Sequence, residues 1–352
     1  MPTNRMNREQ FFGQLATFDE QRLKKALWNL YWRGSAAARE RIEAEIVPDQ
    51  HDRGKRRSKE PVDPQQVLGE VEDFVALARS GAYMAGDRRV SPKERTRWRL
   101  TFKRLVTDAR DGLRAEDAAA AAAALEQLID LACETRDYDY FRSEDPMEAA
   151  RFVVSDAVAL LWAKLQAHYG FAGFAQRAAP QLIRWESRYG WTRSGWGQVS
   201  HKETSLASVL AGMLPAPDMW VGFADRYLDA LDQLARDAPA TRSRVWQSTG
   251  RDRDRRAAEL AEWHRLLLDR LIGSEAEDRL DRLTRHPALG GPELGFLQAQ
   301  LAHQRGDVSN ARSLMHTALQ HLPGHQDFLD LATEIGAPLP PRAQQIIKER
   351  PL

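Results

Sequence analysis

Residues 293–323, ELGFLQAQLAHQRGDVSNARSLMHTALQHLP, point most directly to the architecture of this chain. Two stretches with alanines at helical spacing flank the pair Gly306-Asp307, and Pro323 closes the second stretch. The alanines allow paired helices to approach closely, the glycine permits a tight turn, and the proline stops the second helix. The pattern predicts a helical hairpin.

This stretch resembles a tetratricopeptide repeat. The matching positions are Ala299, Ala302, Gly306, Asp307, Ala311, Ala318 and Pro323. Gly295 and Gln298 depart from the early Trp and Leu of the repeat, and Met315 replaces its usual aromatic residue. The resemblance implies an array of stacked helical hairpins, which commonly holds a peptide or partner protein in a concave groove.

Helix starts recur in the rest of the chain. Three segments combine a capping side chain, a proline and a Gln or Glu at the third helical position: Asp63-Pro64-Gln65-Gln66, Ser91-Pro92-Lys93-Glu94 and Asp145-Pro146-Met147-Glu148. A run of seven alanines, 118–124, also favours helix. The helix after Pro146 is expected to continue through Leu165, and Gly170 is expected at a helix end. We predict an all-α fold of stacked helical hairpins.

The composition and the residues that start and stop helices predict four segments. They are an N-terminal three-helix unit (1–47), a basic linker (48–63), a central helical domain (64–214) and a C-terminal repeat-like region (215–352). In the first segment Asp19 precedes the second helix and Ser35 opens the third. The linker has two prolines and almost no apolar side chain.

Overall composition excludes several classes of protein. Apolar residues make up 43% of the 352 positions, which excludes wholesale disorder, and the net charge is +1. The single cysteine, Cys133, excludes an internal disulfide and a four-cysteine zinc site. Because no apolar run suits a secretory signal or a membrane span, we expect a cytoplasmic protein with no membrane partner.

A basic segment spans residues 88–104, with Glu94 as its one acid. Its basic residues are Arg88, Arg89, Lys93, Arg95, Arg97, Arg99, Lys103 and Arg104. Such a helix face can bind phosphates or an acidic partner, or it can pair with acidic neighbours such as Glu70, Glu72 and Asp73. With the basic residues of 53–59, it makes nucleic-acid association an alternative function.

An aromatic segment from Trp185 to Glu203 interrupts the helical pattern with three glycines. The candidates for partner or ligand binding in and beside it are Arg184, Arg188, Tyr189, Trp191, Arg193, Trp196, His201 and Lys202. Tryptophan beside arginine offers stacking and hydrogen bonding, as in ligand pockets and interface hot spots. The alternative is that the rings fill the ends of neighbouring helices.

The acidic connection 137–145 is a third candidate, because Asp137 and Asp139 can hold Mg²⁺ or take part in acid–base chemistry. Ordinary exposed acids and a capping role for Asp145 are the alternative. Known catalytic motifs and zinc-ligand spacings are missing from the sequence. We therefore expect no metal and no cofactor, and a buried thiol at Cys133.

The function expected from these patterns is that of a non-catalytic helical-repeat protein, an adaptor or scaffold for a partner protein. Two alternatives stay open. One is a nucleic-acid-associated protein that uses residues 88–104 and 53–59. The other is an enzyme of unfamiliar type with a site between 137–145 and 184–203.

Overall fold

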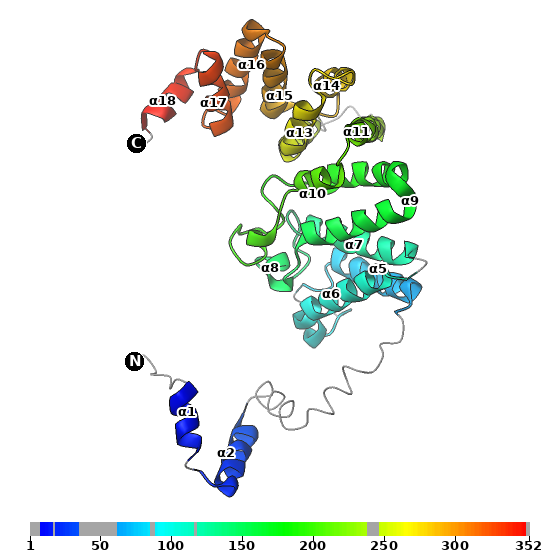
Figure 1. The fold of residues 1–352 in the computed structure, drawn as a ribbon, viewed down its shortest axis with the longest axis vertical. Helices are drawn as coiled ribbons and strands as arrows, with labels where there is room; N and C mark the ends of the chain where they lie inside the picture. The colour runs from blue at the N-terminus through cyan, green and yellow to red at the C-terminus, as the bar shows by residue number, and fades with distance from the viewer. Residues whose placement is uncertain are drawn as a thin grey trace. The chain divides into compact units, whose positions relative to one another are not determined.

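All regular secondary structure of the described chain is helical. The computed structural model describes residues 8–16, 18–34, 62–84, 89–115, 118–237 and 246–349, and none of these residues lies in a β-strand (Figure 1). The predicted all-α class is therefore confirmed. Packing divides the chain into two units, Met1–Val62 and Asp63–Leu352.

The described helices of the first unit are α1 (Arg8–Leu15) and α2 (Glu20–Arg33). The Asp19 side chain accepts a hydrogen bond from the backbone N–H of Arg22 at 2.7 Å, which confirms the predicted start of α2. None of the α2 side chains is buried. The third helix predicted from Ser35 and the basic residues of 53–59 lie outside the described residues.

The second unit begins with α5 (Pro64–Arg79), α6 (Pro92–Gly112) and α7 (Ala119–Glu134). The predicted capping box of α6 is confirmed: Glu94 N–H donates to Ser91 Oγ at 3.3 Å, and Ser91 N–H donates to the Glu94 carboxylate at 3.1 Å. Asp63 likewise caps α5. α7 contains the alanine run and packs against α5 and α6, so the alanines form a close helix interface.

The next helices are α8 (Pro146–Ala150) and α9 (Val154–Trp185). Asp145 caps α8 by accepting a hydrogen bond from Glu148 N–H at 3.2 Å. The expectation of one helix from Pro146 through Leu165 is wrong. Arg151 adopts a left-handed backbone conformation, with φ 50° and ψ 44°, and this separates the two helices.

α9 is itself bent back on itself at Gly170, where φ is 65° and ψ is −177°. The Trp162 indole donates a hydrogen bond to Gln181 Oε1 at 2.9 Å, although 19 residues separate them. In a straight helix these residues would stand about 28 Å apart. The two arms of α9 therefore form a helical hairpin, and the break predicted at Gly170 is confirmed.

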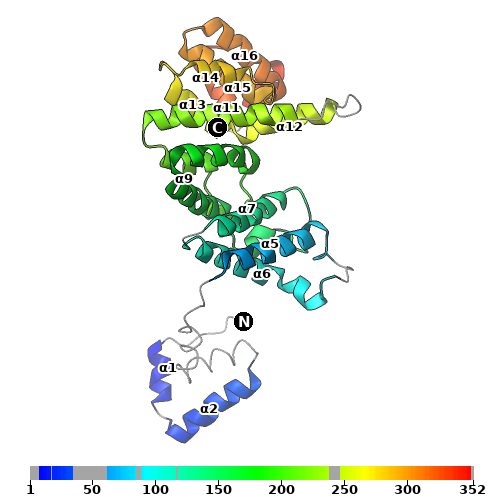
Figure 2. The ribbon, with the colours of Figure 1, turned by 90° about the vertical axis from the view of Figure 1, so that its right-hand side faces the viewer.

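The chain continues through α10 (Leu206–Met213), α11 (Pro217–Asp237), α12 (Trp246–Glu259), α13 (Ala261–Leu271) and α14 (Asp278–Thr284). α11 packs on α9 on one side and on α13 and α14 on the other (Figure 2). Trp263 of α13 stacks on Trp220, with ring centroids 5.6 Å apart, and meets Phe223 and Tyr227 edge-on. The packing of α11 on α9, rather than these ring contacts, crosses the predicted division at 214/215, which stays a prediction.

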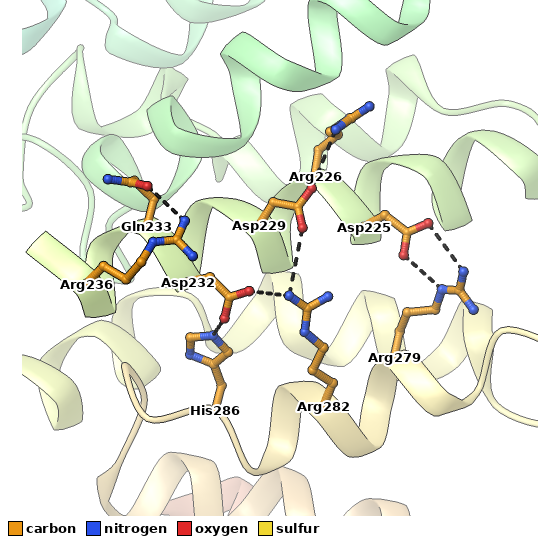
Figure 3. A network of polar contacts seen from close by, with 9 residues as sticks. All are labelled: Asp225, Arg226, Asp229, Asp232, Gln233, Arg236, Arg279, Arg282 and His286. Carbon is orange, nitrogen blue, oxygen red and sulfur yellow. Dashed lines mark hydrogen bonds and ion pairs between the residues drawn. The ribbon is translucent and has the colours of Figure 1, made fainter.

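Ion pairs join α11 to α14 and the turn that follows it (Figure 3). The residues involved are Asp225, Asp229, Asp232, Arg279, Arg282 and His286. Asp225 accepts from Arg279 Nε at 3.0 Å, and Asp232 accepts from His286 Nε2 at 2.9 Å and from Arg282. The hydrogen bond from His286 and the pairing with Arg282 lower the pKa of Asp232. The carboxylate therefore stabilises this junction while it is ionised.

The last helices are α15 (Gly291–Gln304), α16 (Val308–His321), α17 (Gln326–Ile335) and α18 (Pro341–Glu349). Gly306 turns the chain between α15 and α16 with φ 83°, and Asp307 caps α16 by accepting from Asn310 N–H at 3.1 Å. Ala299, Ala311 and other small residues are buried where α15 packs on α16. The hairpin expected over 293–323 is therefore present.

We expect Gly170→Ala to lower the free energy of unfolding by about 1–3 kcal/mol, because its backbone conformation is strained for any residue with a Cβ. A Cβ at Gly170 meets no other atom within 4 Å, so the loss would come from the backbone alone. Gly69→Ala, at an exposed position inside α5, is the control and should raise it by about 0.5–1 kcal/mol. Urea unfolding followed by circular dichroism measures both; equal effects would contradict the role given to Gly170.

Candidate functional site

The connection between α9 and α10, residues 186–205, has little regular structure beyond the 3-10 turn η1 (Ser200–Lys202). Three carboxylates, Glu148, Glu186 and Glu203, accept hydrogen bonds from backbone N–H groups in it, at the start of α10 and at the start of α9. The bonds run from Gln198 and Val199 to Glu148 (2.9 Å each), from Val154 (2.7 Å) and Ser155 (2.9 Å) to Glu203, and from Ala207 to Glu186 (2.7 Å). Charge-assisted bonds of this kind hold the connection in one conformation.

Trp191, one of the predicted binding residues, is a packing residue. It is 2% exposed, and its indole donates a hydrogen bond to the Trp185 carbonyl at 2.9 Å. Trp185 is buried too, and its indole donates to Asp130 at 2.6 Å. For these two rings the structure favours the alternative interpretation, in which they fill the space between helix ends.

The other candidates of the aromatic segment lie in different places. Arg184 pairs with Glu126 at 2.7 Å, and Arg193 pairs with Asp139 at 2.6 Å. Trp196, His201 and Lys202 are exposed and do not line the cavity described next. Arg188, Tyr189 and Trp191 do line it. The structure therefore brings together three of the eight predicted residues.

This cavity lies between the connection 186–205 and helices α12, α13, α15 and α17, and it has a volume of about 640 Å³. We call it the acidic groove. Its charged lining residues are Glu186, Glu203, Glu259, Glu262, Glu293, Asp327, Asp330, Glu334, Arg188 and Arg265. Phe296, Leu297 and Leu331 supply an apolar part of the wall. The groove thus combines negative charge with a place for an apolar group.

Arg188 ties the connection to the helices across the groove. Its backbone N–H donates to the Glu259 carboxylate at 2.6 Å, and its guanidinium pairs with Glu293 and contacts the ring of His325. Glu293 is 7% exposed, so this ion pair is well shielded from water. Arg188 therefore acts as a positioning residue that fixes the two walls of the groove relative to each other.

Sequence reasoning missed most of the acidic lining, which comes from separate helices. One local signal was present: Asp327, Asp330 and Glu334 have the spacing that places side chains on one face of a helix. Glu259, Glu262 and Glu293 gave no such signal, because the fold alone brings them together.

The residues of the basic segment 88–104 also lie in different environments. Arg104 pairs with Glu70 at 2.8 Å, as expected if the basic residues are paired with acidic neighbours. Arg89 donates to the Ser80 carbonyl at 2.8 Å. Arg88 lies outside the described residues. The remaining predicted residues lie on α6 with side chains that are exposed or partly exposed: Lys93, Arg97, Arg99 and Lys103.

The acidic connection 137–145 is engaged in structural contacts. Asp137 pairs with Arg255 at 2.8 Å, and Asp145 accepts from Ser194 N–H at 3.1 Å besides capping α8. Within the ranges that the structure describes, no three His, Cys, Asp or Glu side chains are grouped to hold a metal ion. Cys133 is buried, and this burial raises the pKa of its thiol far above the usual range. Its thiol stays protonated at neutral pH.

Comparison with protein-family models, with curated proteins and with solved structures gave no match for this chain. Among the helices described here, none has the length and apolar character needed to cross a bilayer.

Glu186 is the most strongly perturbed carboxylate of the groove wall. Burial raises its pKa to about 7, although hydrogen bonds from the backbone N–H groups of Ala207 and Ser187 act in the opposite direction. Both carboxylate oxygens accept such bonds, at 2.7 and 2.9 Å. Glu186 is thus a helix-capping group of α10 rather than an exposed acid or base.

We expect the free energy of unfolding to fall by about 3 kcal/mol between pH 4.5 and pH 7 because of Glu186. Its folded-state pKa lies above the unfolded value, so the folded protein binds the proton more tightly and loses this advantage as the pH rises. Glu186→Gln should remove this part of the pH dependence, whatever its effect at a single pH. Urea unfolding at several pH values checks it; parallel curves for both proteins would contradict the assignment.

Proposed function

We propose that this chain is a non-catalytic, cytoplasmic adaptor that holds a peptide segment of a partner protein in the acidic groove. In this proposal the helices from α13 to α17 form a tetratricopeptide-like array, and the connection 186–205 closes one side of its inner surface. The observation that carries the proposal is the groove itself, whose wall is built jointly by this fixed connection and by α13, α15 and α17. Grooves of this kind suit an extended peptide.

The charge of the groove defines the partner. Eight acidic side chains line it against two guanidinium groups. Glu186, with a pKa of about 7, and Glu293, paired with Arg188, add little to the net negative charge, which comes mainly from exposed acids such as Asp327, Asp330 and Glu334. Burial lowers the pKa of His264 to about 3, so this residue adds no positive charge at neutral pH. A segment rich in Lys and Arg matches this field, with an apolar side chain placed against Phe296 and Leu331.

Tyr189 stands at the groove as an exposed aromatic ring. It is 81% exposed and lies beside Arg188 in the connection. A ring in this position can stack on a Lys or Arg of the bound segment. Trp196, in the same connection and 80% exposed, does not line the groove and provides a natural control.

Nucleic-acid association is the second candidate function, supported by the exposed side chains of Lys93, Arg97 and Arg99 on α6. Binding of this kind weakens steeply with salt, in proportion to the phosphates neutralised. A shift assay with mixed DNA and RNA at rising salt tests it; a lack of binding at low salt would dismiss it. For the enzyme alternative, segments 137–145 and 184–203 do meet, yet the acids at their contact are held in ion pairs and caps.

The adaptor proposal predicts that peptides selected from a random display library on the full chain are enriched in Lys and Arg. Asp330→Lys, which places a positive charge in the groove, should weaken the best peptide about tenfold or more in fluorescence anisotropy. Tyr189→Ala should weaken it several-fold. Glu275→Lys, at an exposed site outside the groove, and Trp196→Ala should leave the affinity unchanged.

Two outcomes would contradict the adaptor proposal. One is the selection of peptides without excess positive charge. The other is an equal loss of affinity in Asp330→Lys and Glu275→Lys, which would indicate a general effect of net charge instead of a binding groove.

A further inference from the structure

A second cavity lies between α6, the turn after α5 and the segment around α8, away from the acidic groove. Its volume is about 370 Å³. The lining residues that bear on its chemistry are Tyr83, Arg95, Trp98, Arg99, Arg142 and Ser143. Arg95 and Arg99 belong to the basic segment 88–104, whereas Arg142 comes from the connection 137–145.

The charged side chains that line this cavity in the described part of the chain are all positive. Among the described residues, three arginines line it and no carboxylate does. The acid close enough to affect Tyr83 is Glu94, and its carboxylate is already bound to the backbone N–H and the hydroxyl of Ser91, at 3.1 and 2.6 Å. In the described part of the chain, the arginines of this cavity therefore face no compensating acid in its wall.

Arg95 is the partly buried arginine of this cavity wall. One of its terminal nitrogens donates to the Met84 carbonyl at 3.2 Å, whereas its Nε is buried and has no hydrogen-bond partner among the described residues. Buried N–H groups are almost always paired in folded proteins, but this one is out of reach of the cavity. An anion bound in the cavity would instead meet the terminal nitrogens of the Arg95 guanidinium.

The other residues that line the cavity limit which anions can fit it. Pro92, Trp98 and Ala149 give the cavity apolar sides, and its volume exceeds what one inorganic phosphate needs. Tyr83 is 7% exposed, and burial together with Glu94 raises its pKa to about 12, so its phenol stays a neutral group able to donate. Guanidinium forks suit the tetrahedral oxygens of phosphate.

We propose that this cavity binds a phosphate monoester carried on a small apolar group, with Arg95, Arg99 and Arg142 around the phosphate and Trp98 beside the apolar part. This site is separate from the acidic groove and does not depend on the adaptor proposal.

Isothermal titration calorimetry of the full chain with phenyl phosphate tests the site. Phenyl phosphate should bind more tightly than either inorganic phosphate or phenol, and more tightly at pH 7.5 than at pH 5, because the second pKa of a phosphate monoester is near 6. Arg99→Gln and Arg142→Gln should each weaken binding about tenfold, as expected for loss of one charge-assisted hydrogen bond. Both side chains are exposed, so these variants should keep the fold.

Arg97→Gln is the matched control, because Arg97 is exposed on the same helix and does not line the cavity. It should leave the affinity for phenyl phosphate unchanged. If Arg97→Gln and Arg99→Gln weaken the binding of phenyl phosphate equally, the proposal is overturned. That result would indicate general attraction of anions to the positive charge of α6, which is also the basis of nucleic-acid binding. Equal affinity for phenyl phosphate and phenol, or for phenyl phosphate and inorganic phosphate, would also overturn it.

Discussion

Three carboxylates fix the connection 186–205, which few regular hydrogen bonds hold. Glu148 and Glu186 accept from its backbone N–H groups, whereas Glu203, itself part of the connection, accepts from the first N–H groups of α9. Two of them act at helix N-termini, where Glu203 serves α9 and Glu186 serves α10, and the helix dipole favours a negative charge there. An irregular segment is thereby fixed to two helices at once. The wall of the acidic groove depends on this arrangement.

The chain is almost neutral as a whole, with a net charge of +1, but the fold separates its charges. Carboxylates gather along the acidic groove, whereas arginines gather at the cavity beside α6. Many other charged residues are used in ion pairs between helices, such as those of Arg279 and Arg282 (Figure 3). Total charge therefore says little about binding here, because its distribution determines which ligands each surface attracts.

Local patterns predicted the helix starts well, because a cap depends on residues only three positions apart. Asp19 and Ser91 cap helices at the positions that the neighbouring residues predict. Features that depend on distant contacts were not predictable. The burial of Trp191 requires the Trp185 carbonyl and the helices around it. Arg151 interrupts a pattern that reads as continuous helix, and a non-glycine residue in the left-handed region carries no clear sequence signal. The acidic groove needs the complete fold.

The contact of Arg188 with Glu293 and His325 joins residues 105 and 137 positions apart in the chain. During synthesis, residue 188 emerges long before its partners, and domains form from the N-terminal end as the chain grows. The first wall of the groove can thus assume its local structure early, while the opposite wall is still being made. The groove is complete only when α15 and α17 have docked.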